Sequence, residues 1–250
     1  MSAPNIRLGL VGGSGVEQWP DARLVEKRSV ETPYGAPSAE LQQLELGGTP
    51  VWFLSRHGVG HDIAPHAINY RANIQALSDV GVSHLIALNA VGIIGHRVRP
   101  GALGLPDQII DYTWGRETTF FDGLNEPLQH TEFGEPFCPW LREQLLSAAK
   151  ACDIPLGDGG VYAVTQGPRL ETAAEVDRLE RDGAEFIGMT AMPEAVLAAE
   201  RGISYASVAL VVNEAAGRGH GAIHAQLAQA MEEARGRAAE LVLSFANQIG

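Results

Sequence analysis

The apolar run of residues 204–212 restricts the fold of this chain more than any other stretch. Its β-branched and aliphatic side chains lack the polar alternation of a half-exposed strand, so the run is typical of a strand buried on both faces. Asn213 and Glu214 end it abruptly, before small residues and Gly217. Open α/β sheets bind ligands at the carboxyl ends of such strands, although Asn and Gly also begin ordinary turns. Asn213 is therefore a candidate binding residue.

Strand-like and helix-like segments alternate along the rest of the chain, with no linker, repeat or low-complexity stretch. This alternation is typical of α/β proteins, and the 250 residues suffice for one large domain. We therefore expect a single α/β domain over residues 1–250. The expected strands are residues 6–12, 41–46, 51–55, 84–90, 103–111, 161–165, 185–189 and 204–212. The expected helices are residues 69–80, 139–152, 171–180 and 222–248.

The charge balance and the cysteines limit the class of protein. A net charge of −12 argues against a surface for nucleic acid or an anionic membrane, so an anionic ligand would need a local cluster of donors. No apolar run approaches the roughly 18 residues of a membrane span, and no basic-then-apolar leader is found. Cys138 and Cys152 are too few for a disulfide framework. These features predict a cytoplasmic protein with reduced thiols.

Hydrogen-bond donors follow several of the expected strands. The first group is a Gly-rich turn at residues 12–15, where backbone N–H groups and the hydroxyl of Ser14 can approach an anion closely. Other polar residues at strand ends are Arg56, His57, Asn89 and Thr190. Arg beside His is a plausible pair for an oxyanion. Because we expect no carboxylate near these donors, they suit a phosphate-sized anion.

Two other interpretations of these segments fit less well. A dinucleotide-binding turn needs Gly-x-Gly-x-x-Gly before a helix and an acidic residue about 20 positions later. Here the pattern stops at Gly15, and Gln18, Trp19 and Pro20 follow. His57, His61 and His66 have no partner carboxylate at ligand spacing, which argues against a metal site. We expect neither a nicotinamide cofactor nor a metal.

A second set of polar residues differs in its chemistry. Glu171 offers an acceptor and Asn213 offers an amide that both donates and accepts, which suits the edge of a heterocycle. Residues 114–139 are long, irregular and rich in aromatics, Gly and Pro. A segment of that kind in a compact domain usually serves a site or an interface.

Seven motifs together resemble the trimeric purine nucleoside phosphorylase and methylthioadenosine phosphorylase family. They cover nearly the whole chain in the family's order, which is far more specific than any one motif. The motifs are GGSG (12–15), ETPYGAPS (31–38), RHG (56–58), NYRANI (69–74), EPFCP (135–139), TQGPRLET (165–172) and GMTAMPEAVLA (188–198). Within the family the chain looks closest to bacterial 5′-methylthioinosine phosphorylases. The resemblance implies a mixed central sheet, partly barrel-like and flanked by helices.

The resemblance also implies phosphorolysis, in which inorganic phosphate attacks C1′ of a nucleoside and the purine leaves. Asn89 stands where methylthioadenosine phosphorylases usually have Thr, and Met189 matches the methionine beneath the ribose. His130 matches a histidine that the family contributes across the subunit interface. A homotrimer, or a dimer of trimers, is therefore expected, with residues 114–139 at the interface. The family's phosphate site maps onto Ser14, Arg56, His57, Ala90 and Thr190.

The base-binding positions depart from the adenosine-type enzymes. Those enzymes end the corresponding strand in Asp-x-Asp, whereas this chain has Asn213 and Ala215. An amide can serve both N7 and O6 of a 6-oxopurine. Glu171 replaces the Ser typical of the adenine-specific site, and its carboxylate matches the N1–H that 6-oxopurines have and adenine lacks. The expected base is hypoxanthine, or guanine.

The expected activity is phosphorolysis of S-methyl-5′-thioinosine to hypoxanthine and 5-methylthioribose 1-phosphate, with phosphate as co-substrate and no cofactor. Arg56, with the bound phosphate, would stabilise an oxocarbenium-like transition state, and Asn213 would stabilise charge on the leaving purine. His57 would either tune phosphate protonation or simply donate a hydrogen bond.

The alternatives are an inosine/guanosine phosphorylase, a methylthioadenosine phosphorylase and a non-catalytic nucleoside-binding protein. The 5′ pocket distinguishes the expected activity from an inosine/guanosine phosphorylase, since a thiomethyl group needs an apolar wall and a hydroxyl needs a polar partner. Ile223 and Leu227 would form such a wall, whereas an inward His224 would favour inosine.

Overall fold

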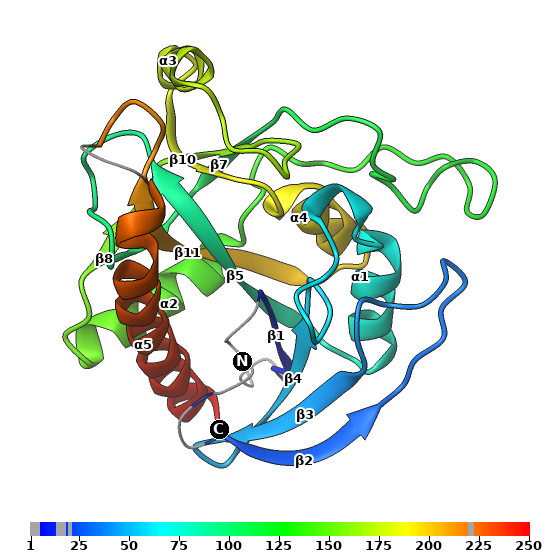
Figure 1. The fold of residues 1–250 in the computed structure, drawn as a ribbon. Coiled ribbons are helices and arrows are strands. Elements are labelled where there is room, and N and C mark those ends of the chain that lie inside the picture. The colour runs from blue at the N-terminus through cyan, green and yellow to red at the C-terminus, as the bar shows by residue number, and fades with distance from the viewer. Residues whose placement is uncertain (1–5, 14–18, 20–21, 220–222) are drawn as a thin grey trace.

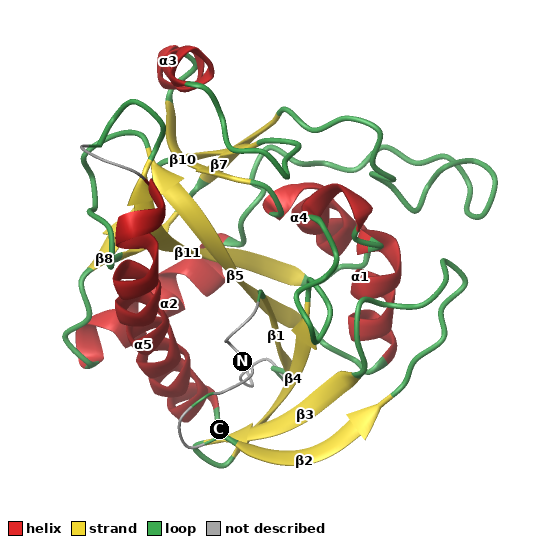
Figure 2. Ribbon diagram, viewed as in Figure 1, coloured by secondary structure: helices red, strands yellow, loops and turns green. Residues whose placement is uncertain are grey.

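The computed structural model describes residues 6–13, 19, 22–219 and 223–250, without the side chains of 223–226. These residues contain an 11-stranded mixed sheet with helices on both sides (Figures 1 and 2). The strands are β1 (Leu8–Gly12), β2 (Arg23–Arg28), β3 (Leu41–Leu46), β4 (Thr49–Ser55), β5 (His84–Ile93), β6 (Leu103–Leu105), β7 (Gln108–Asp111), β8 (Leu156–Asp158), β9 (Val161–Val164), β10 (Ala184–Gly188) and β11 (Ser204–Glu214). The helices are α1 (Tyr70–Asp79), α2 (Pro139–Ala151), α3 (Ala173–Arg181), α4 (Ala191–Glu200) and α5 (Ile223–Ile249), with a 3-10 turn, η1, at Pro65–Ala67. The mixed sheet flanked by helices confirms the expected fold class.

Strand β5 is the centre of this sheet because it changes partners along its length. On one side it pairs in parallel with β11 from His84 to Ile93. On the other side it pairs in parallel with β1 through residues 84–87 and antiparallel with β10 through residues 92–93. Residues 88–91 pair with neither β1 nor β10. β1 and β10 therefore approach this gap from opposite directions.

The predicted burial of the 204–212 run is confirmed, because β11 is buried from Tyr205 to Val212. The strand also continues further than predicted and includes Asn213 and Glu214. Its register against β5 shifts between Val211 and Asn213. Such a bulge bends a strand and re-aims the next side chain. Asn213 is therefore placed by a bulge within the strand and not by a turn after it.

Helices cover the two faces of the sheet. α2 and α5 pack against each other and against β11, over one apolar core that includes Leu145, Leu241 and Phe245. α1 and α4 pack together on the other side, over a second core that includes Ile74 and Leu197. None of the described helices combines the length and apolar character that crossing a membrane requires.

The start of α3 differs from the prediction in a way that matters for the site. The sequence pattern placed Glu171 inside a helix over residues 171–180, but α3 begins at Ala173. Thr172 and Glu175 form a capping box that fixes this start, with each side chain bonded to the other residue's backbone N–H. Glu171 therefore lies in the loop before the helix and is free to turn inward.

Two strand predictions were also incomplete or wrong, and two strands were not predicted at all. The predicted strand over residues 103–111 is two strands, because Pro106 separates β6 from β7. β5 continues to Ile93, so Asn89 lies inside the strand and not at its end. The short strand β8 and the charged, mostly exposed strand β2 (RLVEKR) carry no apolar pattern and were not predicted. Helices α1, α2 and α5 match their predicted segments within about two residues.

Candidate active site

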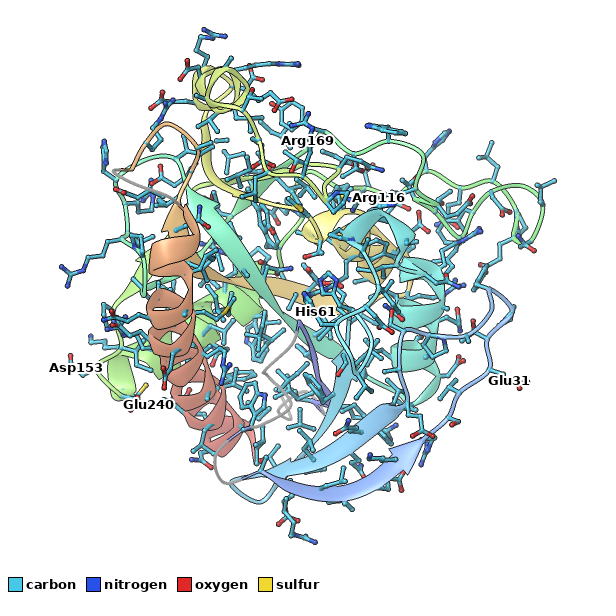
Figure 3. The ribbon with its side chains drawn as sticks, in the orientation of Figure 1. Glu31, His61, Arg116, Asp153, Arg169 and Glu240 are labelled. Carbon is cyan, nitrogen blue, oxygen red and sulfur yellow. The ribbon has the colours of Figure 1, made fainter. Side chains whose placement is uncertain are left out.

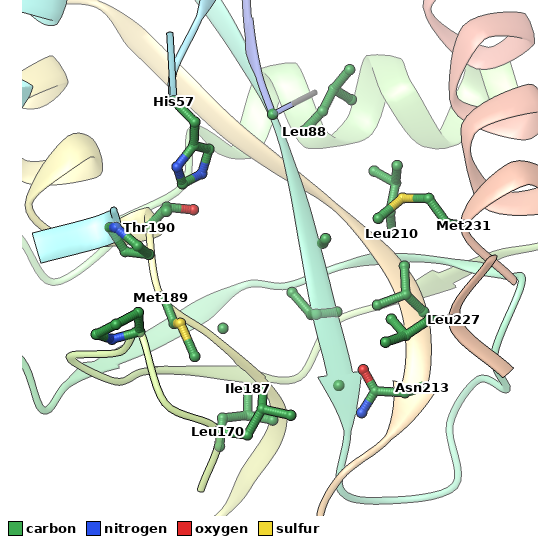
Figure 4. A pocket seen from close by; sticks show the side chains of 18 of the residues that line it. His57, Leu88, Leu170, Ile187, Met189, Thr190, Leu210, Asn213, Leu227 and Met231 are labelled. Carbon is green, nitrogen blue, oxygen red and sulfur yellow. The ribbon is translucent and has the colours of Figure 1, made fainter. Parts of the chain in front are cut away.

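A cavity of about 460 Å³ lies beside the gap in the pairing of β5. That volume suits a small-molecule ligand. Figure 4 shows His57, Met189 and Thr190 on one side of β5 and Leu210, Asn213, Leu227 and Met231 on the other. The cavity is lined by nine of the predicted site residues: Arg56, His57, Ala90, Glu171, Met189, Thr190, Asn213, Ala215 and Leu227.

Arg56 is fully buried at one end of the cavity and is paired with a carboxylate. Its Nε lies 2.6 Å from Oε2 of Glu194 and its Nη2 lies 2.9 Å from Oε1. Nη1 donates to the carbonyl of Leu88, and the hydroxyl of Tyr205 donates to Glu194. The expectation that no carboxylate lies near these donors is therefore wrong. Burial alone would lower the pKa of Arg56, but the charge of Glu194 raises it overall, so Arg56 stays protonated.

The pairing limits what Arg56 can offer to an anion. Both edge positions of the guanidinium fork are taken by Glu194, so bidentate binding of an oxyanion through that edge is excluded. These contacts leave the second hydrogen of Nη1 available for an anion. Because Glu194 also neutralises the charge, neighbouring donors must carry much of any anion binding at this end.

His57 lies next to Arg56 as a neutral imidazole. Burial, with the nearby charge of Arg56, lowers the pKa of His57 to about 4. Its Nδ1 lies 2.8 Å from the carbonyl oxygen of Ile63, which can only accept, so Nδ1 carries the proton. Nε2 is then a hydrogen-bond acceptor at neutral pH. A plain donor role for His57 does not fit this tautomer, whereas a role in phosphate protonation does.

Thr190 is held by a buried chain of hydrogen bonds. Ser207 Oγ donates to Asn89 Oδ1 over 2.8 Å, and Asn89 Nδ2 donates to Thr190 Oγ1 over 2.9 Å. Because Asn89 occupies an acceptor site of Thr190, the hydroxyl hydrogen of Thr190 remains to be donated, either into the cavity or to the nearby hydroxyl of Tyr162. Asn89 was predicted to contact the ligand, but it lies behind Thr190 and is not among the lining residues. Ala90, the next residue of β5, does face the cavity.

Glu171 and Asn213 line the same cavity as Arg56 and Thr190. Oε1 of Glu171 accepts a 2.6 Å hydrogen bond from Thr165 Oγ1. The amide of Asn213 projects from β11 toward the middle of the cavity, and its Nδ2 donates to the carbonyl of Glu214 over 2.7 Å (Figure 4). One Nδ2 hydrogen and Oδ1 of Asn213 remain for a ligand, together with Oε2 of Glu171.

Apolar side chains form most of the remaining wall, to which His61 and Arg235 add two polar side chains. Gly167 has a φ of +60°, and a Cβ there would meet Sδ of Met189 at 2.4 Å, so only glycine allows the 165–172 loop to pack on Met189. On the opposite side, Leu227 and Met231 lie one turn apart on α5. Leu227 was predicted, whereas Met231 was missed although it follows at helical spacing. Leu88, Leu210 and Val212 complete this wall.

Besides Asn89, three predicted site residues are not among the lining residues, and two of these fall outside the part of the chain that the structure describes. Ser14 lies outside the described residues, and so do the side chains of Ile223 and of His224, whose inward orientation would favour inosine. His130 is exposed on the 114–139 segment and does not line the cavity of its own chain. Sequence reasoning also missed Glu194 and Thr165, which contact the predicted residues from other elements. Within the described residues, no group of three or more His, Cys, Asp or Glu side chains could hold a metal ion.

Comparison with known proteins agrees with this geometry. A sequence profile of the phosphorylase superfamily matches residues 7–247. A probable S-methyl-5′-thioinosine phosphorylase of Xanthomonas campestris pv. campestris is 48% identical over 88% of this chain and 88% of its own. The 6-oxopurine nucleoside phosphorylase of Pyrococcus furiosus is 42% identical over 95% of this chain and 91% of its own. The structure of methylthioadenosine phosphorylase from Schistosoma mansoni in complex with adenine matches with a TM-score of 0.91 and 32% identity, over 98% of this chain and 92% of that chain.

Proposed function

The chain belongs to the phosphorylase superfamily, and on that premise we propose that it cleaves S-methyl-5′-thioinosine with inorganic phosphate. The products are hypoxanthine and 5-methylthioribose 1-phosphate. One observation carries the proposal: Arg56 and Thr190, which suit an oxyanion, line the same cavity as Glu171 and Asn213, which suit a 6-oxopurine.

Phosphate lies at the end of the cavity formed by Arg56, His57 and Thr190. Nη1 of Arg56 and the hydroxyl of Thr190 donate to its oxygens. The Nε2 lone pair of His57 accepts the hydrogen of a P–OH group, so His57 favours monohydrogen phosphate over the fully ionised trianion. The backbone of Ala90 and the hydroxyl of Ser14 are the further donors proposed for this anion.

The purine lies at the other end, between Glu171 and Asn213. Oε2 of Glu171 accepts from N1–H, which adenine lacks, while the free Nδ2 hydrogen of Asn213 donates to O6 or N7. Adenine would place its unprotonated N1 against the carboxylate and its 6-amino group against a donor. A site with this pattern rejects adenine because the mismatch leaves buried polar groups unpaired.

Catalysis follows from contacts that strengthen as the glycosidic bond breaks. Met189 lies beneath the ribose, whose ring gains positive charge in the transition state, and the phosphate next to Arg56 stabilises that charge before it bonds to C1′. The electron pair of the broken bond goes to the purine, where Asn213 stabilises it through the 6-oxo edge. Asn213, Arg56 and His57 are the catalytic residues in this scheme.

The methylthio group lies against Leu227 and Met231, which present aliphatic and thioether surface to the cavity. Neither side chain offers a polar partner to a 5′-hydroxyl; the polar group that lines the cavity from α5 is Arg235, one turn beyond Met231. This wall is the reason for preferring a 5′-thionucleoside to inosine.

A homotrimer, singly or as a dimer of trimers, is the assembly proposed for the active enzyme. His130 would then reach the cavity of a neighbouring subunit from the 114–139 segment. The same segment exposes Trp114, Leu124 and Leu128, which are 72%, 91% and 73% accessible. Apolar side chains exposed together are typical of an interface. We place the reaction in the cytoplasm, where Cys138 and Cys152 remain free thiols.

An assay of four nucleosides with and without phosphate tests the proposal. Methylthioinosine should have the highest kcat/KM, and methylthioadenosine should be lower by a factor on the order of 100 or more. No purine should be released without phosphate. Comparable cleavage of methylthioadenosine would contradict the roles of Glu171 and Asn213. Faster cleavage of inosine or guanosine would favour a general 6-oxopurine nucleoside phosphorylase, and binding without turnover would indicate a nucleoside-binding protein.

A further inference from the structure

Arg116 bonds to the backbone of two loops that border the cavity. Its Nη1 donates to the carbonyl oxygens of Met189 at 2.9 Å and Met192 at 2.6 Å. Its Nη2 donates to the carbonyl oxygens of Gln166 at 2.9 Å and, more weakly, Thr165 at 3.4 Å. Figure 3 shows Arg116 beside α4. One guanidinium thus connects the start of α4 with the loop after β9.

Each of these loops carries one end of the candidate active site. Met189 and Met192 flank Thr190, whose hydroxyl faces the anion end. Thr165 donates to Glu171, which faces the base end. Two of the four carbonyls that Arg116 binds belong to Met189 and Met192, which flank Thr190. The other two belong to Thr165, which bonds to Glu171, and to Gln166, which follows Thr165.

The contacts suit arginine and not lysine. The planar guanidinium has five N–H donors in a fixed fork, whereas the ammonium of lysine has three donors at one point. Here Nη1 bonds to the segment at the start of α4, and Nη2 bonds to the loop after β9. Nε adds a 3.3 Å contact to Oε1 of Gln166. Within the described residues, no carboxylate pairs with Arg116, in contrast to Arg56. Arg116 is held by its hydrogen bonds to neutral acceptors, which include the hydroxyl of Tyr70, and by the contact of its guanidinium with the Tyr70 ring.

We propose that Arg116 is a positioning residue that sets the separation between Thr190 and Glu171. This inference rests on the proposed function, since it takes those two residues as the phosphate and purine ends of one substrate pair. Phosphate and nucleoside must lie in line for C1′ to be attacked, and a misplacement of about 1 Å costs a factor on the order of 100 in rate. Arg116 also lies on the 114–139 segment, so in the proposed trimer contacts of that segment with a neighbouring subunit would act on the site geometry.

Arg116→Met and Arg116→Lys test the inference, with Arg201→Met as the matched control. Arg201 is also half-buried and bonds to Glu126 of the same segment, to Tyr34 and to Gln75, none of which lines the cavity. Its guanidinium also lies 3.7 Å from the ring centroid of Phe120. Loss of Arg201 should therefore destabilise the same region without moving either loop.

The readouts are the dissociation constants of inorganic phosphate and of hypoxanthine by calorimetry, kcat for methylthioinosine, and Tm. Arg116→Met should weaken both ligands by about tenfold each and lower kcat on the order of 100-fold. Arg116→Lys should lie between it and the wild type. Arg201→Met should lower Tm with both dissociation constants within about twofold of the wild type.

The inference is overturned if Arg116→Met leaves either dissociation constant unchanged, or if Arg201→Met weakens both ligands as much at the same loss of Tm. A wild-type protein that binds both ligands without converting methylthioinosine would contradict the proposed function alone, because the binding comparison still holds. A wild-type protein that binds neither ligand would contradict both.

Discussion

The hydroxyl of Thr165 donates a 2.6 Å hydrogen bond to Oε1 of Glu171. Since this hydroxyl has a single hydrogen, the bond directs it at the carboxylate and leaves Oε2 for a ligand. Thr165 thereby fixes the orientation of the Glu171 side chain. The proposed recognition of the purine edge depends on that orientation.

Glu171→Gln should reduce kcat/KM for methylthioinosine by about 10- to 100-fold, because an amide donor can turn toward N1–H and leave a buried polar group unpaired. Thr165→Val should have a smaller effect in the same direction. Steady-state assays of both variants with methylthioinosine and methylthioadenosine check this. An unchanged ratio of the two substrates in Glu171→Gln would remove Glu171 from base recognition.

Asn213→Asp should reduce kcat for methylthioinosine on the order of 100-fold, as loss of one donor at a developing anion does elsewhere. In the variant, the carboxylate would also face the carbonyl of Glu214, which in the wild type accepts a hydrogen bond from Asn213 Nδ2. Single-turnover rates separate this loss from product release. A variant with the wild-type rate would show that Asn213 does not stabilise the leaving purine.

Glu194→Gln should destabilise the protein and strengthen its response to phosphate. Removing one charge of a buried ion pair costs about 3–5 kcal/mol, and the uncompensated Arg56 then attracts the anion more strongly. The rise in Tm on adding phosphate should exceed that of the wild type. Glu126→Gln, which removes the partner of Arg201 away from the cavity, is the control and should show the wild-type phosphate response.

His57 should make the free energy of unfolding depend on pH between about 4 and about 6.5. Burial and Arg56 lower the pKa of His57 in the folded protein to about 4, whereas in the unfolded chain it is about 6.5. Between these values the unfolded state binds more protons, so stability rises with pH and levels off above the unfolded pKa. Denaturant unfolding of His57→Gln should show a shallower slope in this range. An identical slope in wild type and variant would contradict the lowered pKa.

Met231→Gln should lower kcat/KM for methylthioinosine by about tenfold or more and change that for inosine much less. The methylthio group loses apolar contact worth about 1–3 kcal/mol, while a 5′-hydroxyl gains a polar neighbour. Inosine assayed on the same variant controls for general damage. Equal losses for both substrates would move the 5′ group away from α5.

The features that could be predicted are those that a continuous stretch of sequence or a family motif encodes. The continuous apolar run predicted β11, and the resemblance indicated Asn213, Glu171 and Arg56. The ion pair between Arg56 and Glu194 joins positions 138 residues apart, and no local pattern encodes such a contact.

Asn89 shows the limit of strand-end reasoning. A polar residue followed by Gly92 suggested the end of a strand, yet β5 continues because it exchanges β1 for β10 at this point. The exchange is a property of the whole sheet, so only the structure places Asn89 behind Thr190. The start of α3 was encoded locally by Thr172 and Glu175, and the capping box could have been found from the sequence.

Because β5 exchanges partners along its length, two portions of the sheet are joined to each other through β5. The portion with β2, β3, β4 and β1 and the portion with β10, β9 and β7 both attach to β5, on either side of residues 88–91. A ligand in the adjoining cavity touches residues after β1 and β4 as well as residues after β9 and β10. A bound ligand therefore cross-links the two portions. The free energy of local unfolding of each portion then depends on the concentration of the ligand, although most strands of that portion do not contact it.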